Sequence, residues 1–367
     1  MTDLGRRLFS DETLSASGKM ACATCHDPRF AYGPSDERSV VLGGAELDKP
    51  GMRAVPSLRY LQTVPAFSEH YFEEAVDESV DQGPTGGHGW DGRAGTVHDQ
   101  ARLPLTSPFE MANESLDAVV VKVEKAAYAA DLRRAFGENL FADRKRAANA
   151  VLLCLEVFQE SPRDFYPYSS RYDAWLRGRG DLTGEEKRGL SLFEDPKKGN
   201  CASCHPSRIR GGAFPQFTDF GFAALGVPRN RTLAVNQDPH FYDLGLSGPL
   251  RTDLANQKKY GGMFRAPPLR NAALRRVFFH NGVFHRLDQA IEFYAERDTQ
   301  PGKWYPKGPN GRVDVFDDLP SEYKANPNEE PPFGRKPGAP PALTRAEIRD
   351  VVAFLKTLTD DDVRAER

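Results

Sequence analysis

Hydrophobic residues recur at helical spacing along much of the chain. After Thr344, one face of a helix collects the apolar residues Ile348, Val351, Val352, Leu355 and Leu358. Residues 115–136 and 144–159 have similar spacing, whereas few segments alternate between apolar and polar positions as strands do. The pattern predicts a mainly α fold.

Two helix starts are legible in the polar positions. Thr183 and Glu186, and likewise Thr344 and Glu347, have the spacing of a capping box, in which each side chain satisfies a free backbone amide of the other residue. We therefore expect helices to begin at both threonines.

A short amphipathic pattern occurs twice, each time before a pair of cysteines. Residues 5–9 (Gly-Arg-Arg-Leu-Phe) precede Cys22 and Cys25, and residues 189–193 (Gly-Leu-Ser-Leu-Phe) precede Cys201 and Cys204. The repeat indicates a duplicated domain. We expect domains at residues 1–165 and 166–367, with a junction near 160–180.

Two segments are too rich in glycine or proline for regular structure. Residues 82–95 are glycine-rich and surround Trp90, and such backbone can wrap closely around a bulky ligand. Residues 300–343 carry many prolines, which no regular helix is expected to accommodate, so they should form an extended surface excursion. Irregular loops should thus join the helices.

The composition argues against two classes of function, nucleic-acid binding and membrane spanning. The chain has 39% hydrophobic and 28% charged residues and a formal net charge of −3. Basic residues are mixed with acidic ones, which argues against nucleic acid, and no apolar run reaches membrane-spanning length. The first residues are already amphipathic, so we expect no signal peptide within this sequence.

Cys22-Ala-Thr-Cys25-His26 and Cys201-Ala-Ser-Cys204-His205 both read C-x-x-C-H, the attachment motif of c-type haem. Two thiols bond to the porphyrin, and the adjacent histidine becomes an axial iron ligand. A zinc site or disulfides are the alternatives, but the two duplicated histidines argue against them. Two covalent c-type haems are predicted, and because such attachment occurs outside the cytoplasm, a bacterial periplasmic location follows. Cys154, in an apolar helix, is expected to be a core residue.

The second axial ligand of each iron distinguishes an electron-transfer cytochrome, in which both irons have two ligands, from a peroxidase, in which one iron has an open face. The spacing of the remaining histidines and methionines identifies none of them as that ligand. The remaining histidines are His70, His88, His98, His240, His280 and His285. The methionines are Met1, Met20, Met52, Met111 and Met263.

Several motifs together resemble the bacterial di-haem cytochrome c peroxidase and MauG superfamily, over nearly the whole chain. They are residues 22–30 (CATCHDPRF), 90–94 (WDGRA), 108–111 (PFEM), 268–271 (PLRN) and 280–284 (HNGVF). The resemblance implies two cytochrome c-like domains, each with one haem, and His26 and His205 as iron ligands.

The resemblance also assigns the residues that distinguish MauG-like enzymes. Tyr294 matches the tyrosine that ligates the electron-storing haem, where ordinary peroxidases have methionine. A phenolate is a hard donor that favours highly oxidised iron. In MauG-like enzymes peroxide then gives a paired Fe(IV) state shared through a tryptophan, which Trp90 matches. Tyr294 as a core aromatic and Trp90 as loop packing are the structural alternatives.

At the first haem the resemblance leaves one face open for hydrogen peroxide. Glu110 matches the residue that moves a proton during O–O cleavage, and Gln100 and Pro104 match the pocket lining. As a bare residue, Glu110 could equally be a charge at a helix start.

At two positions this chain differs from the family motifs, one related to the protein substrate and one related to a calcium ion. MauG has a tryptophan two residues before the second haem cysteine, where this chain has Gly199, so the same protein substrate is not expected. The family's interdomain calcium has an asparagine ligand where Ala54 stands, so a calcium ion is expected without assigned ligands.

Three functions follow from these motifs. The first is a MauG-like or MbnH-like oxidoreductase that uses peroxide to oxidise Trp or Tyr of a periplasmic partner, for example Trp to kynurenine in a copper-binding MbnP-like protein. The second is a cytochrome c peroxidase that takes electrons from a small cytochrome. The third is a di-haem cytochrome that only transfers electrons.

Overall fold

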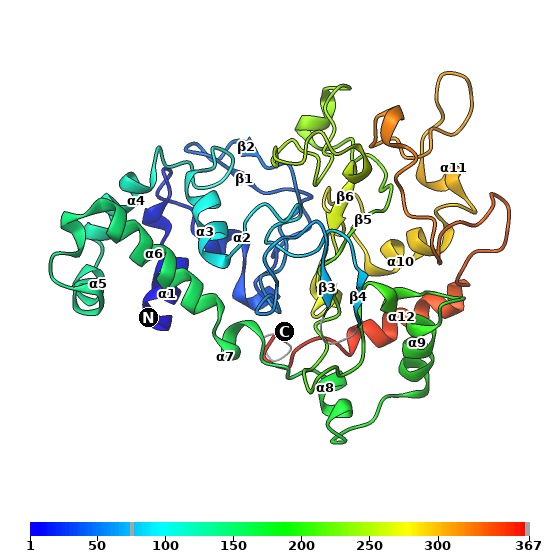
Figure 1. The fold of residues 1–367 in the computed structure, drawn as a ribbon, viewed down its shortest axis with the longest axis horizontal. Helices are drawn as coiled ribbons and strands as arrows, with labels where there is room; N and C mark the ends of the chain where they lie inside the picture. Colours follow the sequence, from blue (N-terminus) through cyan, green and yellow to red (C-terminus); the bar gives the residue numbers. More distant parts are fainter. Residues whose placement is uncertain (74–76, 364–367) are drawn as a thin grey trace.

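The computed structural model describes residues 1–73 and 77–363, and within them the fold is mainly helical (Figure 1). The α-helices are α1 (Thr2–Phe9), α2 (Cys22–Cys25), α3 (Val97–Thr106), α4 (Leu116–Lys125), α5 (Ala129–Phe136), α6 (Arg144–Gln159), α7 (Pro162–Phe165), α8 (Arg171–Leu176), α9 (Gly184–Glu194), α10 (Leu287–Glu296), α11 (Pro301–Trp304) and α12 (Arg345–Lys356). Single 3₁₀ turns occur at Glu12–Leu14, Pro28–Phe30, Leu140–Ala142, Cys201–Ser203, Ala234–Gln237, Lys258–Tyr260, Ala272–Leu274 and Ser321–Tyr323.

Strands in the described residues form only antiparallel pairs. They are β1 (Leu42–Gly43) with β2 (Lys49–Pro50), β3 (Phe72–Glu73) with β4 (Asp77–Asp81), and β5 (Phe222–Ala224) with β6 (Met263–Arg265). The expectation of a mainly α fold is confirmed.

The helix starts predicted from capping boxes are confirmed. Thr183 caps α9 and Thr344 caps α12, and in return each threonine amide donates to the carboxylate of the glutamate three residues later. Residues 115–136 instead form two helices, because the chain leaves the helical conformation at Ala126, after α4. The helical spacing predicted for residues 115–136 is thus realised in two helices.

The repeated sequence corresponds to a repeated packing contact. A Cβ added to Gly5 of α1 would lie 2.0 Å from the Cys154 carbonyl oxygen of α6. A Cβ added to Gly189 of α9 would lie 2.0 Å from the Asp350 carbonyl oxygen of α12. Glycine is therefore required at both helix crossings, and Cys154 is fully buried in the first of them.

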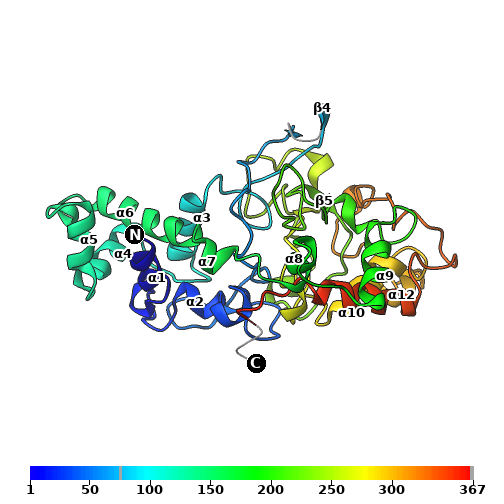
Figure 2. The same cartoon turned by 90° about the horizontal axis from the view of Figure 1, so that it is seen from below.

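The two halves have separate hydrophobic cores. One cluster runs from Leu4 to Phe165, and a second runs from Tyr172 to Leu358. In both ribbon views α1 and α3–α6 lie at one end, and α9, α10 and α12 lie at the other (Figures 1 and 2). The predicted boundary between residues 165 and 166 falls between these clusters and stays a prediction.

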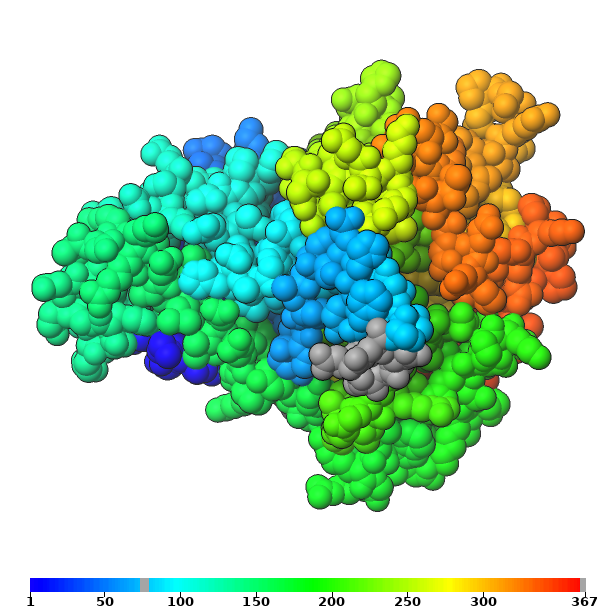
Figure 3. Space-filling model, in the orientation of Figure 1, coloured from blue at the N-terminus to red at the C-terminus, as the bar shows by residue number. Residues whose placement is uncertain are grey.

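Segments from each half cross onto the other half. Thr85 forms a bridge with Gly221, and the Gly86 amide donates to the Phe220 carbonyl at 3.0 Å. On the face shown in Figure 3, the blue segment before β4 covers part of the yellow and green surface. In return, Asp360 accepts hydrogen bonds from Arg59 at 3.0 Å and Tyr60 at 2.6 Å. The glycine-rich residues around Trp90 therefore belong to the junction.

The proline-rich segment is irregular over most of its length (Figure 1, orange), apart from the helix α11 and the 3₁₀ turn Ser321–Tyr323. Pro301 begins the four-residue helix α11, at the first helical position. Proline fits there because the amide it lacks would have no helical partner. The prediction that no helix could occur in residues 300–343 was wrong at this point. Among the described residues, no helix has the length and apolar character needed to cross a membrane.

Candidate active site

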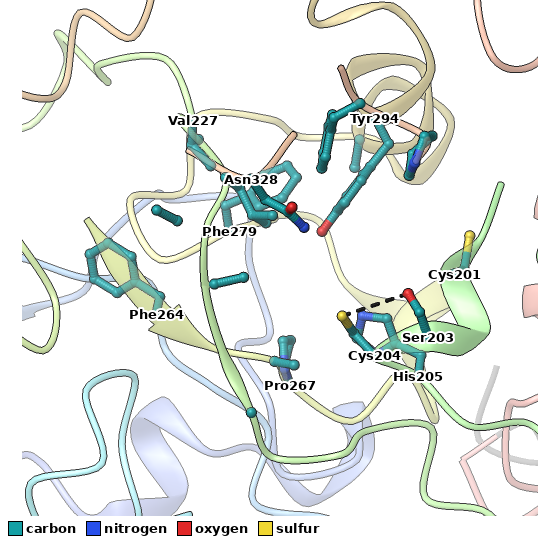
Figure 4. A pocket seen from close by; sticks show the side chains of 18 of the residues that line it. Cys201, Ser203, Cys204, His205, Val227, Phe264, Pro267, Phe279, Tyr294 and Asn328 are labelled. Carbon is teal, nitrogen blue, oxygen red and sulfur yellow. Dashed lines mark hydrogen bonds between the residues drawn. The ribbon is translucent and has the colours of Figure 1, made fainter. Parts of the chain in front are cut away.

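A cavity of about 560 Å³ lies inside the C-terminal half, and its walls are mostly apolar. Cys201, Cys204 and His205 lie on one side, and Tyr294 of α10 extends its hydroxyl toward them from the opposite side (Figure 4). Trp90, from the crossing segment, also lines this cavity. The structure thus brings together four residues of the predicted second haem site and the predicted bridge.

Both C-x-x-C-H histidines are oriented in the same way. The Nδ1 atom of His205 lies 2.7 Å from the Phe217 carbonyl oxygen, and Nδ1 of His26 lies 3.1 Å from that of Tyr32. A carbonyl partner fixes the proton on Nδ1 and leaves the Nε2 lone pair free for a metal. Burial lowers the pKa of each imidazole to about 4, so both are neutral at physiological pH, as iron ligands must be.

Tyr294 is held by aromatic neighbours from the segment before α10 and from the proline-rich segment. Its ring stacks on Phe333 at 5.5 Å and lies 5.7 Å from Phe279. Burial raises the pKa of the Tyr294 phenol, and the nearby thiols of Cys204 and Cys201 raise it further. The hydroxyl therefore faces the cysteine pair from an apolar wall.

The first cysteine pair lies on α2, with the predicted acid–base residue nearby. Burial raises the pKa of both Cys22 and Cys25 to about 12, and the negative charge of Glu110 contributes to each shift. The pKa of Glu110 is itself raised, mainly by burial, while a bond from Ser107 and the charge of Arg93 oppose the rise. Its side chain is nevertheless accessible to solvent.

The backbone around Glu110 is tightly fixed. The Glu110 carbonyl accepts the Gly44 amide at 2.8 Å, and a Cβ on Gly43 would lie 2.1 Å from the Phe109 carbonyl oxygen. Gln100 and Pro104 lie one turn apart on α3, and the Pro104 carbonyl accepts the Met111 amide at 3.0 Å. The residues predicted for the peroxide pocket therefore come from one helix and the turn that follows it.

Trp90 is fixed between the two halves. Its indole Nε1 donates to the Ala54 carbonyl at 2.7 Å, and its own carbonyl accepts the Arg265 amide at 2.9 Å. The indole is half-buried and reaches the C-terminal cavity.

These residues fit a covalently attached haem at each motif. The C-terminal site offers two free thiols, a histidine with a free Nε2 atom, an opposing phenol and an apolar cavity. The N-terminal site offers the same thiols and histidine, with a carboxyl nearby. Among the described residues, only three buried side-chain polar atoms lack a partner, and one of them, His280 Nε2, belongs to a residue that lines the C-terminal cavity.

Two carboxylates at the domain junction, those of Asp91 and Asp243, are already engaged by an arginine. Arg53 binds Asp91 at 2.7 Å and Asp243 at 2.6 Å, so a guanidinium already neutralises these carboxylates. The Ala54 carbonyl is taken by Trp90. Within the described ranges, no group of three or more His, Cys, Asp or Glu could hold a metal ion.

Sequence reasoning left several cavity residues unassigned. Of the histidines and methionines considered as ligands, His280 and Met263 line the C-terminal cavity, and so does Arg265. His70 instead pairs with Asp81 at 2.6 Å on the surface, and His98 lies 3.5 Å from Glu156. The position of His280 within the matching HNGVF motif was the one available signal.

Comparison with known proteins relates this site to one group of enzymes. The family model described as di-haem cytochrome c peroxidase matches residues 1–181. The methylamine utilization protein MauG of Paracoccus denitrificans is 32% identical, over 97% of this chain and 88% of that protein. The cytochrome c peroxidase Ccp of Escherichia coli is 28% identical, over 83% of this chain and 54% of that protein.

Solved structures similar to this chain belong to the same group of enzymes. The diheme peroxidase BthA from Burkholderia thailandensis has a TM-score of 0.87 at 39% identity, over 98% of this chain and 86% of that chain. A MauG-like protein associated with microbial copper homeostasis has a TM-score of 0.66 at 25% identity, over 99% of this chain and 90% of that chain.

Proposed function

Because this chain belongs to the family of di-haem cytochrome c peroxidases and MauG proteins, we propose that it uses hydrogen peroxide to oxidise Trp or Tyr side chains of a periplasmic partner protein. The two haems would be attached at Cys22 and Cys25 and at Cys201 and Cys204. When bound, they supply the redox chemistry, accepting two oxidising equivalents from peroxide and taking electrons from the partner.

One observation carries the proposal. The Tyr294 hydroxyl faces Cys204 and His205 across the C-terminal cavity (Figure 4), so Tyr294 and His205 would together hold the iron of a haem attached there. A phenolate opposite His205 would favour oxidised iron and disfavour the reduced iron that a scavenging peroxidase needs. The site therefore suits storage of oxidising equivalents.

The other site residues have distinct proposed roles. Glu110 would accept the proton of the peroxide oxygen nearer the iron and deliver it to the departing oxygen, with Gln100 and Pro104 shaping that pocket. Trp90 would carry electrons between the haems, since it reaches the C-terminal cavity from the N-terminal chain segment. His26 would hold the first iron from the side fixed by Tyr32.

The partner is proposed by analogy with one relative. The MauG-like neighbour associated with copper homeostasis suggests a copper-binding, MbnP-like protein whose tryptophan would be converted to kynurenine. Haem attachment requires export, so the proposed location is the periplasm. Gly199 argues against the substrate of MauG itself, because the tryptophan expected for that exchange is missing.

A second candidate has an observation in its favour. Met263 also lines the C-terminal cavity, and a thioether ligand there would produce a high-potential haem. The chain would then be a cytochrome c peroxidase that takes electrons from a small cytochrome.

One experiment separates the two candidates. Diferric protein is mixed with peroxide, first alone and then with candidate periplasmic proteins, which are analysed by mass spectrometry for oxidised Trp and Tyr. We expect a long-lived near-infrared absorption followed by oxidation of a partner. Rapid turnover with a reduced small cytochrome, without oxidised residues, would establish the peroxidase instead.

A further inference from the structure

Arg265, which is buried, and Arg275, which is half-buried, differ from the carboxylate-paired arginines of the chain. Arg53, Arg59, Arg229 and Arg270 each bind a carboxylate within 3.0 Å. Within the described residues, Arg265 and Arg275 have no carboxylate partner within ion-pair distance and donate only to backbone carbonyls. Arg265 binds Gly87, and Arg275 binds Val55 and Val277.

Such cations are costly in a folded protein. Burial lowers the pKa of Arg265 and of Arg275 to about 10, which reflects the loss of hydration without a compensating anion. The acidic charge acting on Arg265 is that of Asp91, which Arg53 and Arg93 already bind. Buried charges are normally paired, and the buried Arg265 has no carboxylate of the chain within ion-pair distance.

The C-terminal cavity contains a second polar group without a partner. Arg265 ends β6 and lines the C-terminal cavity, as does His280. The His280 ring is buried and stacks on Phe264 at 3.5 Å and 8°, which fixes its plane, while its Nε2 atom has no partner. An anion inside this cavity would offer oxygen atoms to the guanidinium and to the imidazole nitrogen, both of which line it.

Arg275 lies beside the other cysteine motif. Its charge contributes to the lowered pKa of His26, and its Nη1 atom would lie 3.6 Å from a Cβ added to Gly33. Gly33 follows Tyr32, whose carbonyl orients His26. The C-terminal half of the chain thus places one unpaired arginine at each proposed haem.

We propose that Arg265 and His280 bind a propionate of the haem attached at Cys201 and Cys204, and that Arg275 binds a propionate of the haem attached at Cys22 and Cys25. This inference rests on the proposed attachment of two haems. A haem propionate is the one anion that the proposed cofactor itself brings into each site. Arg265 also donates its amide to Trp90, so the same residue would position that haem relative to the proposed bridge.

The test measures the midpoint potential of each haem and its propionate bending band by resonance Raman spectroscopy. Arg265→Gln should lower the potential of the C-terminal haem, because an uncompensated propionate stabilises ferric iron, and should shift that haem's propionate band. Arg265→Lys should restore most of both signals. Arg275→Gln should act in the same way on the N-terminal haem alone.

His280 is tested with two variants. His280→Phe keeps a ring that can stack on Phe264 but removes the donor, so the C-terminal propionate band should shift, whereas His280→Gln should retain the wild-type band. Arg188→Gln, which breaks an exposed pair with Asp350, is the matched control and should leave both haems unchanged.

Three results would overturn the inference. The first is an unchanged midpoint potential and propionate band in fully haem-loaded Arg265→Gln. The second is an equal change at both haems in Arg265→Gln or Arg275→Gln, and the third is a C-terminal propionate band that His280→Phe does not shift. Absence of covalent haem from the wild-type chain, measured by intact mass, would instead reject the proposed function.

Discussion

Trp90 and Ala54 are joined by a 2.7 Å hydrogen bond from the indole Nε1 to the backbone carbonyl. The Ala54 amide in turn donates to the His280 carbonyl at 2.7 Å. The position of the indole is therefore fixed by backbone groups from both halves of the chain. Electron transfer through an aromatic ring depends on such a fixed position.

We expect Trp90→Phe to uncouple the two haems without preventing their attachment. Phenylalanine keeps an apolar ring but loses the indole N–H and is much harder to oxidise. Peroxide should then fail to produce the near-infrared absorption of the diferric protein, while the haem content is unchanged. Trp175→Phe is the control, because Trp175 packs on Tyr172 and does not line the cavity. An undiminished band in the Trp90 variant would exclude it as the bridge.

Tyr294→Phe should remove the proposed oxygen ligand while keeping the ring that stacks on Phe333. We expect the spectrum of the C-terminal ferric haem to change and the near-infrared absorption to be lost. Tyr294→Met should raise the midpoint potential of this haem, since a thioether favours ferrous iron. Optical and electron paramagnetic resonance spectra measure both effects. Identical spectra for wild type and Tyr294→Phe would point to Met263 or another ligand.

Glu110→Gln should slow the reaction with peroxide by about 10²–10⁴-fold, the usual contribution of a positioned acid–base group. Because the pKa of Glu110 is raised, the carboxylate needed to accept the peroxide proton is lost at a higher pH than for an ordinary glutamate. The wild-type rate should therefore fall toward low pH, and this limb should be absent in the variant. Stopped-flow rates across pH provide the measurement, with the exposed Glu114→Gln as control.

The local patterns of the sequence were enough to predict much of the fold. Capping boxes at Thr183 and Thr344 depend on residues three positions apart, so the chain itself contains the whole interaction. The repeated glycines at 5 and 189 predicted a duplication, but not that each would allow a helix crossing, because the contacting residues are distant in sequence.

The candidate site was only partly predictable for the same reason. Each C-x-x-C-H motif is contiguous in the sequence. The surroundings of Arg265, Arg275 and His280, in contrast, come from distant parts of the chain and are known only from the fold. An arginine in a sequence is usually paired or exposed, and nothing local indicated that these two would lack a carboxylate partner, or that Arg265 would be buried. The Arg53 pairs with Asp91 and Asp243 likewise join residues far apart in the chain.

We expect the domain junction to be independent of calcium. Arg53 is 7% exposed in its side chain and neutralises Asp91 and Asp243, as a divalent ion would otherwise do. Although burial raises the pKa of Asp91, the charges of Arg53 and Arg93 lower it below its usual value. A chelator should leave the thermal midpoint and the haem spectra unchanged. A lower midpoint with chelator, restored by added calcium, would reveal a metal site at another position.

Asp173→Asn should strongly destabilise the C-terminal half. Asp173 and Arg270 form a bidentate pair at 2.7 and 2.8 Å, and both side chains are fully buried. Asparagine conserves size but leaves a buried guanidinium without its counter-charge, which costs about 3–5 kcal/mol of unfolding free energy. Chemical denaturation followed by circular dichroism measures this loss.

The same logic predicts a rescue. Replacing both partners with apolar residues, as in Asp173→Leu with Arg270→Met, removes the unpaired charge and should recover part of the loss. Arg188→Gln, at an exposed pair with Asp350, should cost less than about 1 kcal/mol. If Asp173→Asn cost no more than Arg188→Gln, the buried pair could not be what fixes α8 against residues 215–217, where Arg270 also binds the Pro215 carbonyl at 2.7 Å.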